Sequence, residues 1–436
     1  MVDFDELTRR AQACSLAGVT GKIISVDELG LEALLPGARI GHRVEVSSTP
    51  GGPVIRAEVA RCEGERARLL PLSSTTGIGV GDRVEIIETA GTIPCGDALI
   101  GRVIDPFGAP LDGLPQLAGT QPWPLHRLAP DPMSRDAIDE QLVTGLRAID
   151  GCLAIGKGQR IGLFAGPGEG KSTLLATLAK DAAADACVIC LVGERGREVR
   201  EFVDGILGDE GLRRSVVVLA SADAPPLVRV QALETATAVA EWFRSKGKHA
   251  LLLVDSLTRV VRARRDTALA LGEAPARAGF PVSSFSSLPA MLERAGRDGV
   301  GSITAVYAVL TEGTDDDPVA QEARSLLDGH IVLSDRLAGA GRWPAIDVVK
   351  SISRVMGSIV SKEHRLTADT LRRLQGALGE NEDLILMGAY KKGSSKDTDT
   401  ALARKERIDA FLQQGPDEIS TLEQTITALK DLTREA

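Results

Sequence analysis

The sequence predicts an α/β protein in three parts: a small N-terminal β-barrel, a central domain built on a parallel sheet, and a C-terminal helical domain. Three patterns predict this order. Short β-like runs separated by turn residues occupy roughly the first ninety residues, continuous apolar runs alternate with helical patterns in the middle, and a polar, helical stretch follows. We place the three parts at residues 1–95, 96–356 and 357–436.

The first part has the punctuation of a small barrel. Turn signals at Pro36-Gly37, at residues 50–53 and at residues 79–82 separate its β-like runs. Regularly spaced short strands with such breaks favour a barrel. The expected strands are Gly21–Ile24, Arg43–Val46, Val54–Val59 and Arg83–Ile87.

The central part contains fully apolar strands separated by helical patterns. Such strands indicate a parallel sheet that is covered by helices on both faces. The expected strands are Cys187–Val192, Ser215–Ala220, Ala250–Val254, Ser302–Leu310 and His330–Leu333. In the last part an apolar row recurs at helical spacing and predicts a helix; it consists of Ile419, Leu422, Ile426, Leu429 and Leu432.

The stretch Ile161–Lys180 has the parts of a cradle for nucleotide phosphates. An apolar run leads into a glycine-rich turn and then into an apolar-periodic helix. Backbone N–H groups of such a turn point at phosphate oxygens, so Gly166, Gly168 and Gly170 supply room that side chains would fill. The helix dipole adds partial positive charge where the phosphates lie.

The residues that follow the turn complete the motif. Lys171 is expected along the β- and γ-phosphates, and the Ser172 hydroxyl is expected to ligate Mg²⁺. Ala165 stands where the common pattern begins with glycine, which is a tolerated variant. A chance glycine turn before a buried helix is the alternative, and it is disfavoured because strand, turn, Lys-Ser and helix all occur in order.

Two carboxylates follow apolar strands further along the chain. Asp255 ends the run Leu251–Val254, and in phosphate-loop enzymes such a strand neighbours the loop strand and its Asp holds Mg²⁺ through water. Glu194 follows the expected strand Cys187–Val192, which lies in the sequence between the phosphate loop and the strand of Asp255. We expect Glu194 at the carboxyl edge of the sheet, where it could polarise an attacking water.

Composition narrows the classes of function. The chain has 436 residues, of which 25% are charged and 43% hydrophobic, as is usual for a globular protein of two or three domains. Its net charge of −9 argues against a surface built throughout to hold polyanions, although it leaves room for a local basic channel. Six scattered cysteines do not form a disulfide framework, and the pair Cys187 and Cys190 reads as part of a buried strand rather than a metal site.

No stretch has the pattern of a signal peptide or the length of a membrane span. We therefore expect a cytoplasmic protein whose membrane contact is peripheral. Phe4, Leu7 and Ala11 form a weak apolar face that could dock a membrane or a partner, but a frayed terminus is the better default.

Further stretches are individually diagnostic and span most of residues 100–356. With the phosphate loop, they make the chain resemble the hexameric ATPases related to the catalytic subunits of rotary ATP synthases, and most closely the ATPase of type III secretion systems, flagellar or virulence-associated. The first hundred residues and the tail match only in layout, although Leu386–Tyr390 and Ile408–Leu412 also look like this family. The diagnostic stretches are Gly101–Gly113, Thr144–Ser172, Gly193–Val199, Val254–Arg259, Leu271–Arg277, Gly301–Ala305, Leu327–Leu333, Trp343–Asp347 and Ser351–Arg354.

The resemblance implies catalytic roles. Lys171 keeps its phosphate role, Asp255 is the carboxylate on the Mg²⁺ side, and Glu194 is the base that activates water. Arg195, next to that base, is implied to sense or steady the γ-phosphate. Arg354 falls where relatives place an arginine finger that enters the neighbouring subunit's site.

The resemblance also implies an adenine contact and reveals one departure. Trp343 stands where relatives usually have Tyr against adenine, and a buried aromatic before Pro344 is the alternative. Glu169 replaces a small apolar residue; an outward-turned Glu would be harmless, whereas an inward-turned Glu would weaken nucleotide binding. The predicted metal residues are Ser172 and Asp255, and the predicted nucleotide contacts are Gly166, Pro167, Gly168, Glu169, Gly170, Lys171, Ser172, Thr173 and Trp343.

The implied whole is a barrel, a RecA-like P-loop ATPase core and a helical cap, assembled as a homohexamer around a pore. Mg²⁺-dependent ATP hydrolysis would release export substrates from chaperones and deliver them unfolded to an export channel. The implied partners are a central stalk, peripheral stator and regulator proteins, chaperone–substrate complexes and the export gate, on the cytoplasmic face of the bacterial inner membrane. In relatives, the loop that matches residues 271–281 faces the channel, whereas a plain connecting loop is the alternative here.

Three other functions stay open at this stage. A rotary ATP synthase subunit shares the chemistry but usually carries a longer helical domain after the position of Arg354. A Rho-like RNA translocase would want aromatic residues on a basic N-terminal face, and Phe4 is the single aromatic residue in positions 1–95, so we expect no nucleic-acid partner. A non-catalytic nucleotide-binding module is disfavoured because Lys171, Glu194 and Asp255 are all present.

Overall fold

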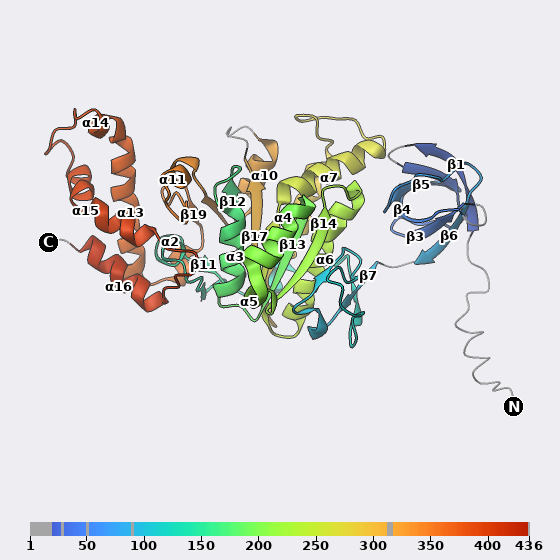
Figure 1. The fold of residues 1–436 in the computed structure, drawn as a ribbon, viewed down its shortest axis with the longest axis horizontal. Coiled ribbons are helices and arrows are strands. Elements are labelled where there is room, and N and C mark those ends of the chain that lie inside the picture. The colour runs from blue at the N-terminus through green and yellow to red at the C-terminus, as the bar shows by residue number, and fades with distance from the viewer. Residues whose placement is uncertain (1–19, 28–29, 49–51, 89–90, 312–316, 435–436) are drawn as a thin grey trace.

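The computed structural model describes residues 20–27, 30–48, 52–88, 91–311 and 317–434. Figure 1 shows three parts in a row, with the β-barrel at one end, the sheet domain in the middle and the helical domain at the other end. The predicted fold class is confirmed, while the boundaries after residues 95 and 356 stay a prediction. The expected apolar face of Phe4, Leu7 and Ala11 lies outside the described residues. Within the described ranges, no helix has both the length and the apolar character needed to cross a membrane.

The barrel closes in the order β1-β2-β5-β4-β3-β6. Alternate side chains such as Val44, Val46, Ala57 and Val59 fill its interior and are buried. The two strands that we did not expect, β2 and β5, are rich in Leu, Ala, Glu and Arg, and apart from Leu these residues have little preference for strands, so only their pairing reveals them. The strands are β1 (Thr20–Asp27), β2 (Gly30–Leu34), β3 (Arg43–Ser47), β4 (Val54–Glu63), β5 (Arg66–Pro71) and β6 (Arg83–Glu88).

Arginine side chains join the barrel to the sheet domain. The Arg43 guanidinium lies 4.9 Å from the centre of the Phe107 ring. Arg68 donates a hydrogen bond to the Ala270 carbonyl at 3.4 Å.

A nine-stranded sheet forms the middle part, with the main order β19-β18-β12-β17-β15-β13-β14-β8 and β16 paired to β17. The strands from β18 to β8 are parallel, and β19 and β16 are antiparallel to their neighbours. All five expected central strands are present. Their bounds are β8 (Val103–Ile104), β12 (Arg160–Ala165), β13 (Ala186–Glu194), β14 (Ser215–Ser221), β15 (His249–Asp255), β16 (Gly296–Arg297), β17 (Ser302–Leu310), β18 (Gly329–Val332) and β19 (Ile352–Ser353).

One expectation about this sheet is wrong. The strand of Asp255, β15, does not neighbour the loop strand β12, because β17 lies between them and pairs with both. β17 is apolar over nearly its whole length, and all its residues except the last are buried, so a central position suits it better than an edge. Asp255 is therefore two strands away from the strand that enters the phosphate loop.

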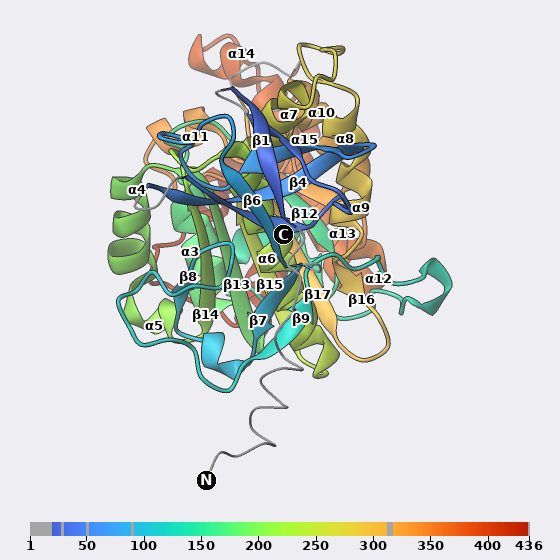
Figure 2. The same cartoon turned by 90° about the vertical axis from the view of Figure 1, so that its right-hand side faces the viewer.

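Helices cover both faces of the sheet, as expected. Along β13, Cys187, Ile189 and Leu191 face one core, while Val188 and Cys190 face the other, so each apolar strand serves both layers. Figure 2 shows α3, α4 and α5 on one side of the strands and α8, α9 and α10 on the other. The helices are α3 (Lys171–Asp181), α4 (Gly196–Arg200), α5 (Gly208–Leu212), α6 (Pro226–Ser245), α7 (Leu257–Ala270), α8 (Ser283–Ser286), α9 (Leu288–Leu292), α10 (Pro318–Leu326) and α11 (Asp335–Gly339), with a π-helical stretch at Glu201–Leu207.

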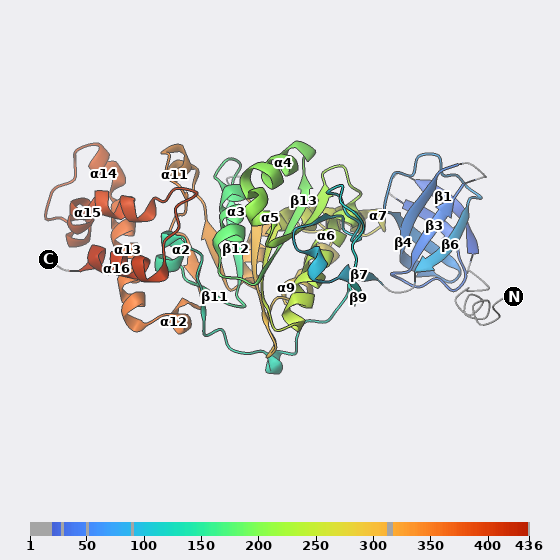
Figure 3. The same cartoon turned by 60° about the horizontal axis from the view of Figure 1, so that its bottom comes forward.

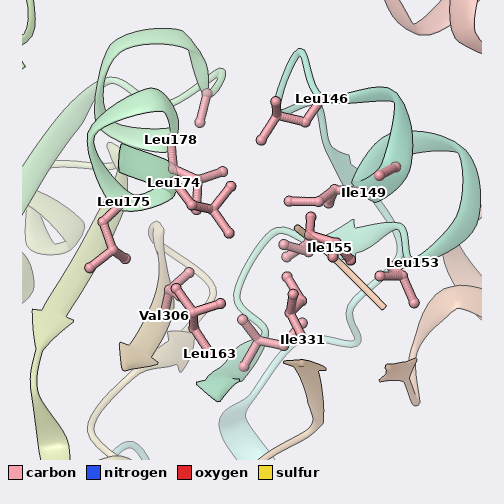
Figure 4. Packing of buried hydrophobic residues seen from close by; sticks show 14 of the residues in the cluster. Leu146, Ile149, Leu153, Ile155, Leu163, Leu174, Leu175, Leu178, Val306 and Ile331 are labelled. Carbon is pink, nitrogen blue, oxygen red and sulfur yellow. The ribbon is translucent and has the colours of Figure 1, made fainter. Parts of the chain in front are cut away.

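The helix that follows the phosphate loop, α3, packs against the short helix α2 (Arg147–Cys152) and the sheet. In Figure 4 the side chains of Leu174 and Leu178 face those of Ile149 and Ile155 across this core. The loop is therefore held by a helix whose inner face is fully buried.

The C-terminal helices pack on the same core, and Figure 3 shows α2 against α13 and α16. The apolar row predicted there needs correction, because Ile419 precedes α16 and is 61% exposed, whereas Leu429 and Leu432 are buried. This row joins two domains and does not offer an open face. The helices are α12 (Met356–Ile359), α13 (Lys362–Glu380), α14 (Glu382–Leu386), α15 (Lys396–Leu412) and α16 (Leu422–Thr433).

Candidate functional site

The phosphate loop has the predicted strand–turn–helix form. β12 ends at Ala165 and α3 begins at Lys171. Gly168 and Gly170 have φ angles of 82° and 87°, which side-chain-bearing residues rarely adopt. A Cβ on Gly170 would lie 2.9 Å from the Trp343 ring, so glycine is also required there for packing.

Lys171 lies between two carboxylates at the carboxyl edge of the sheet. Its ammonium forms an ion pair with Asp255 and lies 4.0 Å from a Glu194 carboxylate oxygen. The side chains are 12% (Lys171), 3% (Asp255) and 14% (Glu194) exposed, so solvent screens these charges little. The structure therefore brings together three of the five predicted catalytic residues, from β15, β13 and the start of α3.

The pKa of Glu194 is raised to about 7, and burial is the largest cause. The neighbouring Asp255 and a hydrogen bond with Glu198 act in the same direction as burial, while Lys171 and Arg259 act against it. A carboxyl with a pKa near neutrality is well matched to accept a proton at cellular pH.

Arg259 belongs to this cluster and was given no role on sequence grounds. One of its guanidinium nitrogens lies 3.1 Å from the second Glu194 oxygen, and it also donates a hydrogen bond to the Gly193 carbonyl. Arg259 stands in the first turn of α7, directly after Asp255 and the N-cap Ser256. The sequence signal that could have identified Arg259 is its position, one helical turn after the carboxylate that ends a strand.

The other two predicted catalytic residues lie away from the cluster. The Arg195 side chain is 82% exposed and lies 3.6 Å from Glu198. The Arg354 backbone N–H donates to the Asp328 carbonyl, and the Asp328 carboxylate pairs with Arg160 at the start of β12. Lys171 lies beyond the other end of that strand. Since β12 spans about 16 Å at ~3.3 Å per residue, Arg354 does not reach the phosphate loop of its own chain.

Trp343 lies beside the phosphate loop, with its ring against Gly170. It is half-buried, and its carbonyl accepts a hydrogen bond from the Gln414 backbone N–H at 2.8 Å. The Gln414 side chain also donates to the Gly145 carbonyl at 2.7 Å. The helical domain thus holds the predicted adenine contact in place, a role for Gln414 that no sequence pattern indicated.

The residues fit a magnesium ion. Ser172 lies half-buried in the first turn of α3, and Asp255 supplies a buried carboxylate, so both donors are the hard oxygen ligands that Mg²⁺ prefers. The Lys171 ammonium against Asp255 shows that this carboxylate already attracts a positive charge.

Three family models match consecutive parts of the chain. The ATP synthase alpha/beta family beta-barrel domain matches residues 17–87 and the nucleotide-binding domain of the same family matches residues 145–353. The T3SS EscN ATPase C-terminal domain matches residues 360–431. The last match separates this chain from the rotary synthases, whose chemistry it shares.

Relatives agree over nearly the whole length. The flagellum-specific ATP synthase of Bacillus subtilis is 46% identical over 95% of this chain and 95% of its own. The SPI-2 type 3 secretion system ATPase of Salmonella typhimurium is also 46% identical, with the same two coverages. The assembled ATPase EscN of enteropathogenic E. coli, solved in complex with its central stalk EscO, matches with a TM-score of 0.87 and 42% identity over 95% of this chain and 100% of that chain. The chain therefore belongs to the ATPases of flagellar and virulence type III secretion systems, within the wider ATP synthase alpha/beta family.

Proposed function

We propose that this ATPase works as a homohexamer whose active sites lie between subunits and that it powers type III protein export. The observation that carries this proposal is the division of the catalytic residues. Lys171, Asp255 and Glu194 cluster at one edge of the sheet, while Arg354 lies at the opposite edge, with its side chain exposed. An arginine in that position can act only on nucleotide bound to another subunit.

The chain's own residues supply the steps of hydrolysis. The N–H groups of the phosphate loop and Lys171 bind the polyphosphate, with Gly166–Thr173 along the phosphates and Trp343 against adenine. Ser172 and Asp255 would hold Mg²⁺, which supplies positive charge to the phosphoryl oxygens when bound. Glu194 accepts the proton of the attacking water, and Arg259 orients the Glu194 carboxylate. Arg195 and the partner subunit's Arg354 complete the positive surroundings of the γ-phosphate.

Export is the use that we assign to this hydrolysis, because residues 360–431 match the T3SS EscN ATPase C-terminal domain and a type 3 secretion system ATPase is 46% identical to the chain. By likeness to EscN, which was solved with its central stalk EscO, we place a central stalk in the pore. The role in export leads us to propose stator and regulator proteins, chaperone–substrate complexes and the export gate as further partners of the hexamer. We assign the hexamer to the cytoplasmic face of the bacterial inner membrane, as a peripheral complex.

The C-terminal helices with the apolar row from Ile419 to Leu432 are the surface expected from the sequence to receive a chaperone–client complex, and this expectation needs correction. In the row from Ile419 to Leu432, Leu429 and Leu432 are buried and Leu422 and Ile426 are half-buried, so this row offers little apolar surface to a partner. We propose instead the surface at α14, which lies near the end of the helical domain in Figure 1. Leu386 and Met387, at the end of this helix, are 78% and 72% exposed. The candidate channel loop is exposed over residues 272–279. Phe280 is buried against Phe285, with ring centres 5.2 Å apart, so it anchors this loop.

The Glu194→Gln variant should bind ATP almost as well as the parent protein while kcat falls by roughly 100-fold to 10,000-fold, because an amide can hold water but cannot take its proton. Lys171→Ala should weaken nucleotide binding as well as turnover. The measurements are nucleotide affinity and steady-state hydrolysis of both variants. Near-normal turnover in Glu194→Gln would remove Glu194 as the base.

The pH profile gives a second readout of the same base. Its raised pKa keeps Glu194 protonated, and therefore inactive, below a pH of about 7. The parent protein should thus lose kcat/KM as the pH falls through about 7, and Glu194→Gln should show residual activity without this limb. An unchanged limb in the variant would assign the titration to another group.

Mixtures of variants test the shared site. Arg354→Ala should bind ATP but hydrolyse it slowly, and mixing it with Lys171→Ala subunits should restore activity above the average of the two parents, because some interfaces then contain both intact residues. The control mixes Arg354→Ala with the double variant Lys171→Ala, Arg354→Ala, in which no interface contains both. If the first mixture matches the control although mixed hexamers form, Arg354 does not act between subunits.

Client release tests the use of hydrolysis. With a cognate chaperone–client pair, release should require ATP, fail with Lys171→Ala, and slow several-fold in Leu386→Ser, Met387→Ser while ATP turnover is retained. Leu128→Ser is the matched control, because Leu128 is 95% exposed but lies on a loop of the sheet domain. Strong stimulation of turnover by single-stranded RNA, with no client release, would instead support a Rho-like translocase.

A further inference from the structure

The phosphate loop contains a carboxylate that the hydrolysis steps above do not use. Glu169 is half-buried, and its Oε2 accepts a hydrogen bond from the Gly166 backbone N–H at 2.7 Å. Its Oε1 lies so close to the loop that a Cβ on Gly166 would meet it at 2.9 Å. The side chain therefore folds back across the loop instead of extending into solvent.

This hydrogen bond joins the two ends of the loop. At the start, the Ala165 carbonyl accepts from the Thr311 N–H at 3.0 Å, and at the end the Gly170 carbonyl accepts from the Leu174 N–H at 3.0 Å. Between these anchors, Gly168 gives the backbone more conformational freedom than any other residue type would. The bond from Glu169 to Gly166 restricts that freedom, and so it favours the shape in which the loop N–H groups converge on phosphate.

The same side chain places a negative charge on a loop that binds polyphosphate. Lys171, the nearest cation in sequence, is engaged by Asp255 and Glu194. A carboxylate on the loop therefore repels the phosphates, and the repulsion is greatest when no divalent cation accompanies the nucleotide.

We propose that Glu169 is a positioning residue with two opposing effects on the nucleotide: its hydrogen bond holds the phosphate loop in the binding shape, while its charge weakens the hold on phosphate and speeds release of ADP. The proposal rests on the assignment of this loop as the nucleotide site. The Glu169 side chain thus keeps the loop ordered and also limits the affinity of the site for the product ADP.

Two substitutions separate the two effects. Glu169→Gln keeps an acceptor for the Gly166 N–H but removes the charge, so it should bind ADP about fivefold more tightly than the parent protein. Glu169→Val removes both and should bind ADP about fivefold more weakly than Glu169→Gln. The gain in Glu169→Gln should be larger in EDTA than with Mg²⁺, and in steady-state hydrolysis its KM should fall by a larger factor than kcat changes.

The measurement is ADP affinity of the full-length chain by calorimetry, with and without Mg²⁺, beside the two kinetic constants. Glu406→Gln is the matched control, because it removes one negative charge from the exposed face of α15 and should leave ADP affinity unchanged. The proposal is overturned if Glu169→Gln binds ADP no more tightly than the parent protein, or if Glu169→Val equals Glu169→Gln. Failure of the parent protein itself to bind nucleotide would instead overturn the assignment of the site.

Discussion

The ion pair between Lys171 and Asp255 is the interaction on which the rest of the site depends. Both side chains are almost completely buried, so each charge would be costly without the other. Their pairing also sets the conditions for Glu194, which lies 4.0 Å from the same ammonium. Asp255 raises the pKa of Glu194 and Lys171 lowers it, and together with burial they leave this pKa near neutrality. The pKa of Glu194 is thus set mainly by burial, and the charges of Asp255 and Lys171 adjust it in opposite directions.

The order of strands explains the spacing of these groups. Neighbouring strands lie about 4.8 Å apart, so the strand of Asp255 lies roughly 10 Å from β12 and the strand of Glu194 about one spacing further. The Lys171 ammonium contacts Asp255 at the end of β15, although β17 lies between that strand and β12. The phosphate loop, the proposed metal carboxylate Asp255 and the proposed base Glu194 therefore follow one another along a single edge of the sheet. The backbone N–H of Arg354 donates to the Asp328 carbonyl near the opposite edge, which agrees with the proposal that Arg354 acts on another subunit.

Much of this arrangement could be predicted from the sequence, because the signals are local. An apolar run, a glycine turn and Lys171-Ser172 depend on neighbours in the chain, and the structure contains them as expected. The position of β17 between β12 and β15 depends on pairing between strands more than a hundred residues apart, which local patterns do not report. The same holds for the contact of Gln414 with Trp343 and for the inward side of the C-terminal apolar row. The inward turn of Glu169 depends on one side-chain rotamer, and sequence reasoning left both orientations open.

The most direct measurement is the structure of the assembled protein with Mg²⁺, ADP and a fluoride analogue of the transferred phosphoryl group. The account predicts that Lys171 leaves Asp255 for the phosphate oxygens, that Ser172 and Asp255 lie on the magnesium side, and that the partner subunit's Arg354 approaches the analogue opposite Glu194. If the Lys171–Asp255 pair persists with the analogue bound, or if Arg354 stays remote from every analogue in a closed ring, the central claim is contradicted.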